Sequence, residues 1–95
     1  MLLLDRQTLD DYGNKYPGAR PHINSWILVV QEAHWTTPME MKEEFPSAKI
    51  LGKQQVVFKI EGNRHRLLVK IAYKTGTILV KKIGTHKEYD KWEFK

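Results

Sequence analysis

The sequence of 95 residues contains no cysteine, and no stretch of it approaches the ~18 consecutive apolar residues of a membrane-spanning helix. The lack of cysteine excludes a disulfide scaffold and every zinc site built on thiolates. Near the N-terminus the only apolar patch is residues 2–4, which Asp5 follows at once, so we expect no secretory leader. Repeats, linkers and low-complexity stretches are also lacking. With 41% hydrophobic and 11% aromatic residues, we expect one soluble, cytoplasmic domain over residues 1–95.

The net charge of +5 is distributed unevenly along the chain. Residues 1–48 carry four Lys and Arg against seven Asp and Glu, a balance of −3, whereas residues 49–95 carry twelve against four, a balance of +8. A basic half attracts polyanions, and for a small domain of this kind nucleic acid is the leading candidate. A basic surface that only improves solubility is the alternative.

The acidic half has the periodicity of helices. We predict a first helix capped by Asp5 and ended by Pro17-Gly18, and a second that begins near Pro21. The second helix should bury the apolar stripe of Ile23, Trp26, Ile27 and Val30. Residues 37–40 (Thr-Pro-Met-Glu) form a capping box, which predicts a third, short helix ending near residues 45–46.

The basic half has the period of two that is typical of strands. Residues 56–61 and 66–73 alternate around Gly62-Asn63, which we expect to supply the positive φ angles of a hairpin turn. A further strand is expected at residues 77–83, and residues 2–4 can form an edge strand. The predicted fold class is therefore α+β, with two or three helices packed on one face of a mostly antiparallel sheet that is basic and open on its other face.

Cationic side chains should gather on the open face. Arg66 and Lys70 alternate with the apolar residues of one strand, and Lys59 faces them from the neighbouring strand. Like charges on adjacent strands repel each other mildly, so their concentration suggests an anionic ligand; a plain solvated face is the alternative. Arg64, Lys82 and Lys87 are further candidates for contacts with a nucleic-acid backbone.

The segment that follows the last strand carries the groups suited to acid–base chemistry. His86 can exchange a proton near neutral pH, and Tyr89 shares its face if a helical turn begins at Thr85. An ordinary structural histidine is the alternative for His86, and His65, beside the hairpin turn, is ambiguous. The histidines lack the i, i+4 spacing of metal ligands and no carboxylate cluster is present, so we expect neither a metal nor a cofactor.

The order of motifs over almost the whole chain resembles the HigB toxins of bacterial type II toxin–antitoxin systems, within the RelE-like group. The resemblance runs through residues 33–35, Pro38, residues 45–48, 50–52, 56–58, 62–63, 66–67 and 69–71, Tyr73, and residues 83–91 (Ile-Gly-Thr-His-Lys-Glu-Tyr-Asp-Lys), the most specific block. It implies an mRNA endonuclease (an mRNA interferase) that acts on the translating ribosome. It also implies a HigA-type antitoxin with a helix-turn-helix domain, which holds a monomeric toxin in a larger complex.

Metal-free cleavage of RNA uses the neighbouring 2′-hydroxyl as nucleophile and needs a base, an acid and cations for the charge that grows on phosphorus. We assign Arg66 to that charge and His86 to acid or base duty, with Tyr89 positioning or sharing the proton. The division between His86 and Tyr89 stays open. Two alternatives remain: a non-catalytic RNA- or ribosome-binding module, and a regulatory protein whose helices dock a DNA-binding partner.

Overall fold

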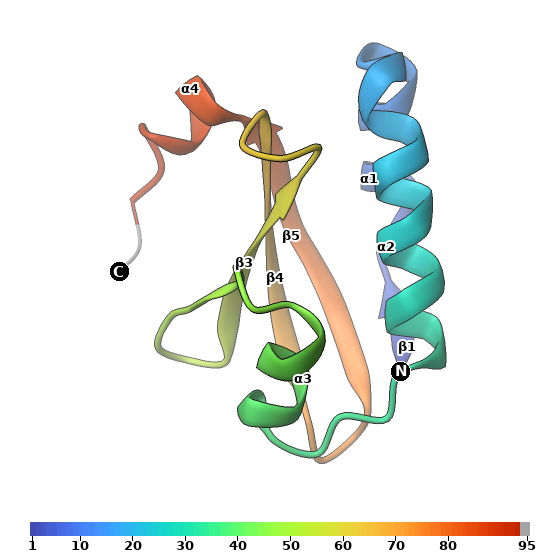
Figure 1. Cartoon of the computed structure of the whole chain (residues 1–95), viewed down its shortest axis with the longest axis vertical. Helices are drawn as coiled ribbons and strands as arrows, with labels where there is room; N and C mark the ends of the chain where they lie inside the picture. Colours follow the sequence, from blue (N-terminus) through green and yellow to red (C-terminus); the bar gives the residue numbers. More distant parts are fainter. Residues whose placement is uncertain (94–95) are drawn as a thin grey trace.

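Three helices and a five-stranded sheet form the two main layers of the domain, and a short fourth helix lies beyond the sheet (Figure 1). The computed structural model describes residues 1–93. In chain order the elements are β1 (Leu2–Leu4), α1 (Arg6–Lys15), the 3₁₀ helix η1 (Pro17–Ala19), α2 (Arg20–Glu32), α3 (Pro38–Glu44), β2 (Lys49–Ile50), β3 (Gln55–Ile60), β4 (His65–Ala72), β5 (Thr77–Thr85) and α4 (His86–Tyr89). The predicted α+β class, with helices on one face of the sheet, is confirmed.

Apolar periodicity located the helices correctly. The predicted stripe of α2 is at most 3% exposed at each position, and it packs against β3, where the Trp26 and Phe58 rings meet edge to face 5.3 Å apart. The third helix begins after Thr37, whose side chain accepts a hydrogen bond from the Glu40 N–H (3.3 Å). The return bond differs from the predicted box, because the Glu40 carboxylate accepts from the N–H of Thr36, one residue earlier (3.2 Å).

The strands lie in the order β1-β5-β4-β3-β2. The chain from β3 to β5 is an antiparallel meander, whereas β1 joins the far edge parallel to β5. β5 continues to Thr85, two residues beyond its predicted end. A bulge opposite Leu68 and Val69 shifts the pairing, so that Lys82 faces Leu68 while Val80 faces Val69 and Lys81 is the extra residue. Alternation resumes beyond the bulge, which places Lys82 and Gly84 on the sheet face that carries Arg66.

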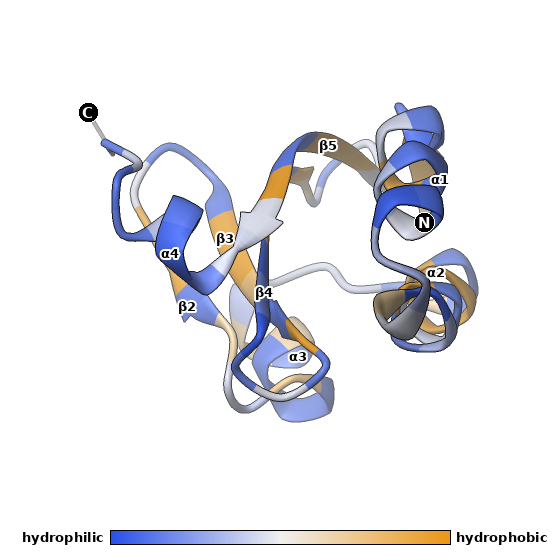
Figure 2. Cartoon of the chain, turned by 90° about the horizontal axis from the view of Figure 1, so that it is seen from above, coloured by the Kyte–Doolittle hydropathy of each residue, from blue (hydrophilic) through white to orange (hydrophobic). Residues whose placement is uncertain are grey.

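The second face of the sheet is covered at one end, which contradicts the expectation of an open basic face. Leu68 and Val57 lie on this face and are only 4% and 3% exposed. α4 and the segment after it pack here, on the side of the sheet away from α1 and α2 (Figure 2). A methyl group added at Gly84 would lie 3.0 Å from Trp92 Cζ2 and 3.2 Å from Glu88 Cβ. Aromatic side chains therefore cover one end of the sheet face that the alternation of charged residues had predicted to be open to solvent.

Two turn details also differ from prediction. Asp5 precedes α1 as predicted, but its backbone is left-handed (φ 63°), and its carboxylate accepts a hydrogen bond from the Thr8 hydroxyl (3.0 Å) and caps no backbone N–H. The β3–β4 turn spans four residues between the paired Ile60 and His65, so its positive φ angles fall on Glu61 (55°) and Gly62 (65°) and not on Gly62-Asn63.

Candidate active site

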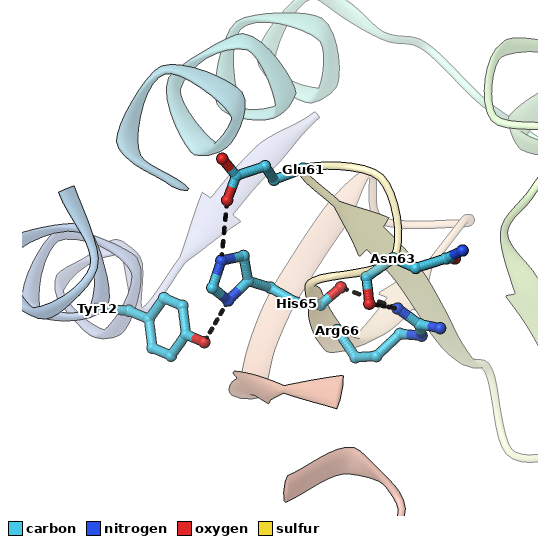
Figure 3. A network of polar contacts seen from close by, with 5 residues as sticks. All are labelled: Tyr12, Glu61, Asn63, His65 and Arg66. Carbon is cyan, nitrogen blue, oxygen red and sulfur yellow. Dashed lines mark hydrogen bonds and ion pairs between the residues drawn. The ribbon is translucent and has the colours of Figure 1, made fainter. Parts of the chain in front are cut away.

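Arg66 lies at the end of the sheet next to the β3–β4 turn. β4 places it opposite Lys59 of β3 and Gly84 of β5. Its side chain is bent back onto the turn, where Nη1 donates to the carbonyl oxygens of Asn63 (2.8 Å) and His65 (3.3 Å) (Figure 3). The guanidinium carbon lies 5.3 Å from the centre of the Tyr89 ring, within the range of a cation–π contact. The neighbours of Arg66 thus come from β3, β5 and α4.

The charge of Arg66 is buried and has no acidic partner among the described residues. The residue is only 7% exposed, and no carboxylate within residues 1–93 forms an ion pair with it. Removing a charge from water costs several kcal/mol in lost hydration, and buried charges are therefore normally paired. Lys59 on the neighbouring strand adds charge of the same sign. The site consequently favours an anion, and the planar guanidinium fork matches the oxygens of a phosphate.

α4 is held against this end of the sheet by a reciprocal cap. The Thr85 hydroxyl accepts from the Glu88 N–H (3.2 Å), and the Glu88 carboxylate accepts from the Thr85 N–H (3.0 Å). Hydrogen bonds from the Thr85 backbone and side chain lower the pKa of Glu88. The first N–H of the helix, that of His86, donates to the carbonyl of Arg64 in the turn (2.9 Å). The spacing Thr-x-x-Glu of residues 85–88 is the sequence signal that could have predicted this cap.

His86 and Tyr89 have different surroundings within α4. The His86 side chain is half exposed, and its Nδ1 lies 3.3 Å from a carboxylate oxygen of Asp90, which orients the ring. Tyr89 is partly buried between the Arg66 guanidinium and the Trp92 ring, whose centre is 5.4 Å away. The structure thus brings Tyr89 into contact with Arg66 and places His86 at the solvent-facing start of the same helix.

The remaining predicted cations differ in their distance from Arg66. Lys59 is exposed directly across the strand pair, and Lys82 lies on the same face with Nζ 5.1 Å from the centre of the Trp92 ring. Lys70 also lies on this face, but it is four residues along the strand from Arg66, about 13 Å at the usual rise. Lys87 is exposed on α4 and Arg64 is exposed in the β3–β4 turn. Lys59 is therefore directly opposite the arginine, and Lys82 shares its sheet face.

A buried polar network on the other side of the turn was not predicted. The His65 ring, 6% exposed, lies between the Tyr12 hydroxyl (2.6 Å from Nδ1) and the Glu61 carboxylate (3.2 Å from Nε2) (Figure 3). Burial raises the pKa of the Tyr12 phenol well above its usual range. Tyr12 is 53 residues away along the chain, so no local pattern could have linked it to His65.

The described part of the chain offers neither a metal site nor a membrane-spanning helix. In residues 1–93 no group of three or more His, Asp or Glu side chains is arranged to hold a metal ion. The same residues contain no helix that combines the length and the apolar character needed to cross a bilayer.

The chain matches known proteins over nearly its whole length. Residues 19–92 match the family described as HigB toxin, RelE-like toxic component of a toxin-antitoxin system. The mRNA interferase HigB of Escherichia coli O6:H1 is 30% identical over 94 residues, which are 96% of this chain and 90% of that protein. The mRNA interferase toxin HigB of E. coli K12 and the mRNA interferase HigB of Shigella flexneri are each 28% identical over 93 residues, 95% of this chain and 88% of theirs. The motif order, the α+β fold and this match together show that the chain belongs to the HigB family, the RelE-like toxic components of toxin–antitoxin systems.

Proposed function

We propose that this toxin is an mRNA interferase, an endoribonuclease that cleaves messages on the translating ribosome. The names of its relatives support the reaction class. The proposed position of the active site rests on the burial of Arg66. A buried guanidinium without an acidic partner in residues 1–93 is suited to bind a phosphodiester. The chain's antitoxin is proposed to be a HigA-type protein with a helix-turn-helix domain, which holds a monomeric toxin in a larger complex.

The proposed reaction is a transesterification within the RNA. The 2′-oxygen attacks the adjacent phosphorus and gives up its proton to a base, the bond from phosphorus to the 5′-oxygen breaks, and that oxygen receives a proton from an acid. The products are a 2′,3′-cyclic phosphate and a 5′-hydroxyl. Negative charge on the non-bridging oxygens grows in the transition state, so a preorganised cation stabilises that state more than the bound substrate.

Each site residue has a role suited to its position. Arg66 stabilises the charge on the phosphorane, with Lys59 and Lys82 adding to the local positive potential. His86, oriented by Asp90, exchanges protons with the 2′-oxygen or the 5′-oxygen. Tyr89 holds the Arg66 side chain in place or shares the proton. Lys70, Arg64 and Lys87 contact the RNA backbone away from the scissile phosphate.

The composition of the site also supports dependence on the ribosome. His86 is half exposed and is the one imidazole among the described residues assigned to the site, so most of the rate must come from accurate placement of the 2′-hydroxyl in line with the leaving oxygen. A flexible single-stranded message adopts that geometry rarely by itself. We expect free RNA to be cut far more slowly than ribosome-bound message.

Expression in cells without the antitoxin tests the proposal. Wild type should arrest growth and give codon-associated 5′ ends in mapped mRNA, whereas Arg66→Ala and His86→Ala should give neither while remaining folded by circular dichroism. His34→Ala is the matched control, because His34 is exposed and lies near the β4–β5 turn, at the opposite end of the sheet. Growth arrest without new mRNA ends, unchanged in His86→Ala, would instead indicate a non-catalytic RNA- or ribosome-binding module.

A further inference from the structure

A hollow opens between η1 and the β3–β4 turn, on the side of the turn away from Arg66. Its volume is about 290 Å³, and its lining includes Lys15, Tyr16, Glu61, Arg64 and His65. This volume is just below the range of ~300–1,000 Å³ for small-molecule sites, so it suits one nucleotide and not a longer segment. The hollow adjoins the candidate active site, since the carbonyl of Arg64 accepts the hydrogen bond that begins α4.

One wall of the hollow is a cluster of packed aromatic rings. The centre of the Tyr16 ring lies 4.7 Å from that of Tyr12 and 5.5 Å from that of His65. The hydrogen bonds of His65 to Tyr12 and Glu61 hold the His65 and Tyr12 rings in place, and the Tyr16 ring packs against both. A preorganised ring loses little conformational entropy when a planar group stacks on it. Nucleobases are planar, and each base stacked on an aromatic side chain strengthens binding about 5- to 160-fold.

The polar groups of the hollow match the rest of a nucleotide. Lys15 and Arg64 are exposed cations at its rim and suit a phosphate. Glu61 has one carboxylate oxygen on His65, and its other oxygen, Oε2, lies beside Gly18 in the lining of the hollow, 3.5 Å from where a methyl group on that glycine would lie. A carboxylate accepts hydrogen bonds and cannot donate them. It therefore favours bases with an exocyclic amino group and disfavours uracil, whose carbonyl oxygens flank its single ring N–H.

We infer that this hollow is a second RNA subsite, which binds one nucleotide flanking the scissile phosphate and discriminates against uridine. The inference rests on the proposed mRNA cleavage. The base stacks on the Tyr16 ring in place of the Lys15 ammonium, which lies 5.5 Å from the ring centre, and its amino group lies on Glu61. The displaced Lys15 and Arg64 contact its phosphate. The message passes around the β3–β4 turn, from Arg66 past Arg64 to the hollow.

Mapping of mRNA 5′ ends after expression of each variant tests the inference. Wild type should show uridine depleted at one fixed position beside the cut. Glu61→Gln should remove that depletion, because the amide of glutamine can donate to a uracil carbonyl. Glu43→Gln, an exposed carboxylate on α3, should retain it. Tyr16→Leu should lower kcat/KM on programmed ribosomes about 5- to 160-fold.

The outcomes separate this inference from the proposed function. If wild type cuts messages and Arg66→Ala does not, but Glu61→Gln keeps the wild-type base frequencies, the subsite is wrong and the endonuclease proposal stands. If wild type cuts no message, both are wrong. Should Tyr16→Leu lose stability in urea, Arg64→Ala provides the second test, because Arg64 is exposed in a turn; unchanged kcat/KM in that variant would also overturn the subsite.

Discussion

Replacing Arg66 by methionine should lower the cleavage rate strongly with little change in stability. Burial of the guanidinium costs several kcal/mol in hydration. Its two hydrogen bonds to carbonyls return about 1.5–3 kcal/mol each, and the Tyr89 ring about 0.5–2 kcal/mol. These contributions nearly cancel, and methionine retains the packing of the apolar stem. We expect the free energy of unfolding to change by less than about 1.5 kcal/mol, while cleavage falls about 10²- to 10³-fold.

Urea denaturation and cleavage on programmed ribosomes measure the two effects separately. Phe58→Ala provides the reference for a structural residue, because Phe58 is 2% exposed and contacts the rings of Trp26 and Phe45; its loss should cost about 3–5 kcal/mol. A loss above about 3 kcal/mol in Arg66→Met would mean that the arginine maintains the fold, as when a buried ion pair is broken. Cleavage at the wild-type rate would refute its role in the transition state.

Four further changes have defined outcomes. Trp26→Ala should lower the free energy of unfolding by about 3–5 kcal/mol, and an unchanged urea midpoint would contradict the core position of this indole. Gly84→Ala should displace α4 and impair cleavage while the urea midpoint stays near that of wild type, because a Cβ there meets Glu88 and Trp92 at 3.2 and 3.0 Å. Full activity would show that Glu88 and Trp92 move aside without displacing α4. The pKa of Glu88 is lowered in the folded protein, so its contribution to stability is present above the ordinary titration range of glutamate and is lost as the pH falls. In an NMR titration to low pH, the amide signals of residues 86–89 should therefore lose their folded chemical shifts before the core unfolds. Lys59→Ala should reduce the slope of log affinity against log salt for a labelled single-stranded RNA by about 0.7, and an unchanged slope would place Lys59 outside the RNA contact.

Local patterns predicted the elements that local forces determine. The stripe of α2, the Thr37 cap of α3 and the strands of the meander follow from side-chain periodicity and capping chemistry, which act over a few residues. The hairpin was also predicted, but not its turn geometry: the four-residue loop shifts the left-handed residues to Glu61 and Gly62, and the residue types did not fix the loop length.

The candidate site was predicted less completely than the fold. Sequence reasoning placed Arg66 and Lys59 on one sheet face, and their cross-strand pairing confirms that placement. It did not predict that Tyr89 covers the arginine, nor that Tyr12 and Glu61 enclose His65. These contacts join segments up to 53 residues apart, and a single sequence carries no local signal of such pairs.

The sequence by itself determined the charge division between the two halves, the helical and strand segments, and the sheet face to which Arg66 belongs. Only the tertiary structure decided that this arginine is buried without an acidic partner in residues 1–93, and that a bulge in β5 turns Lys82 toward the same face. The physical reason is that periodicity sets the direction of a side chain within its own strand. Burial depends on which distant segment packs over that strand, and here α4 and Trp92 do so because Gly84 has no side chain to keep them away.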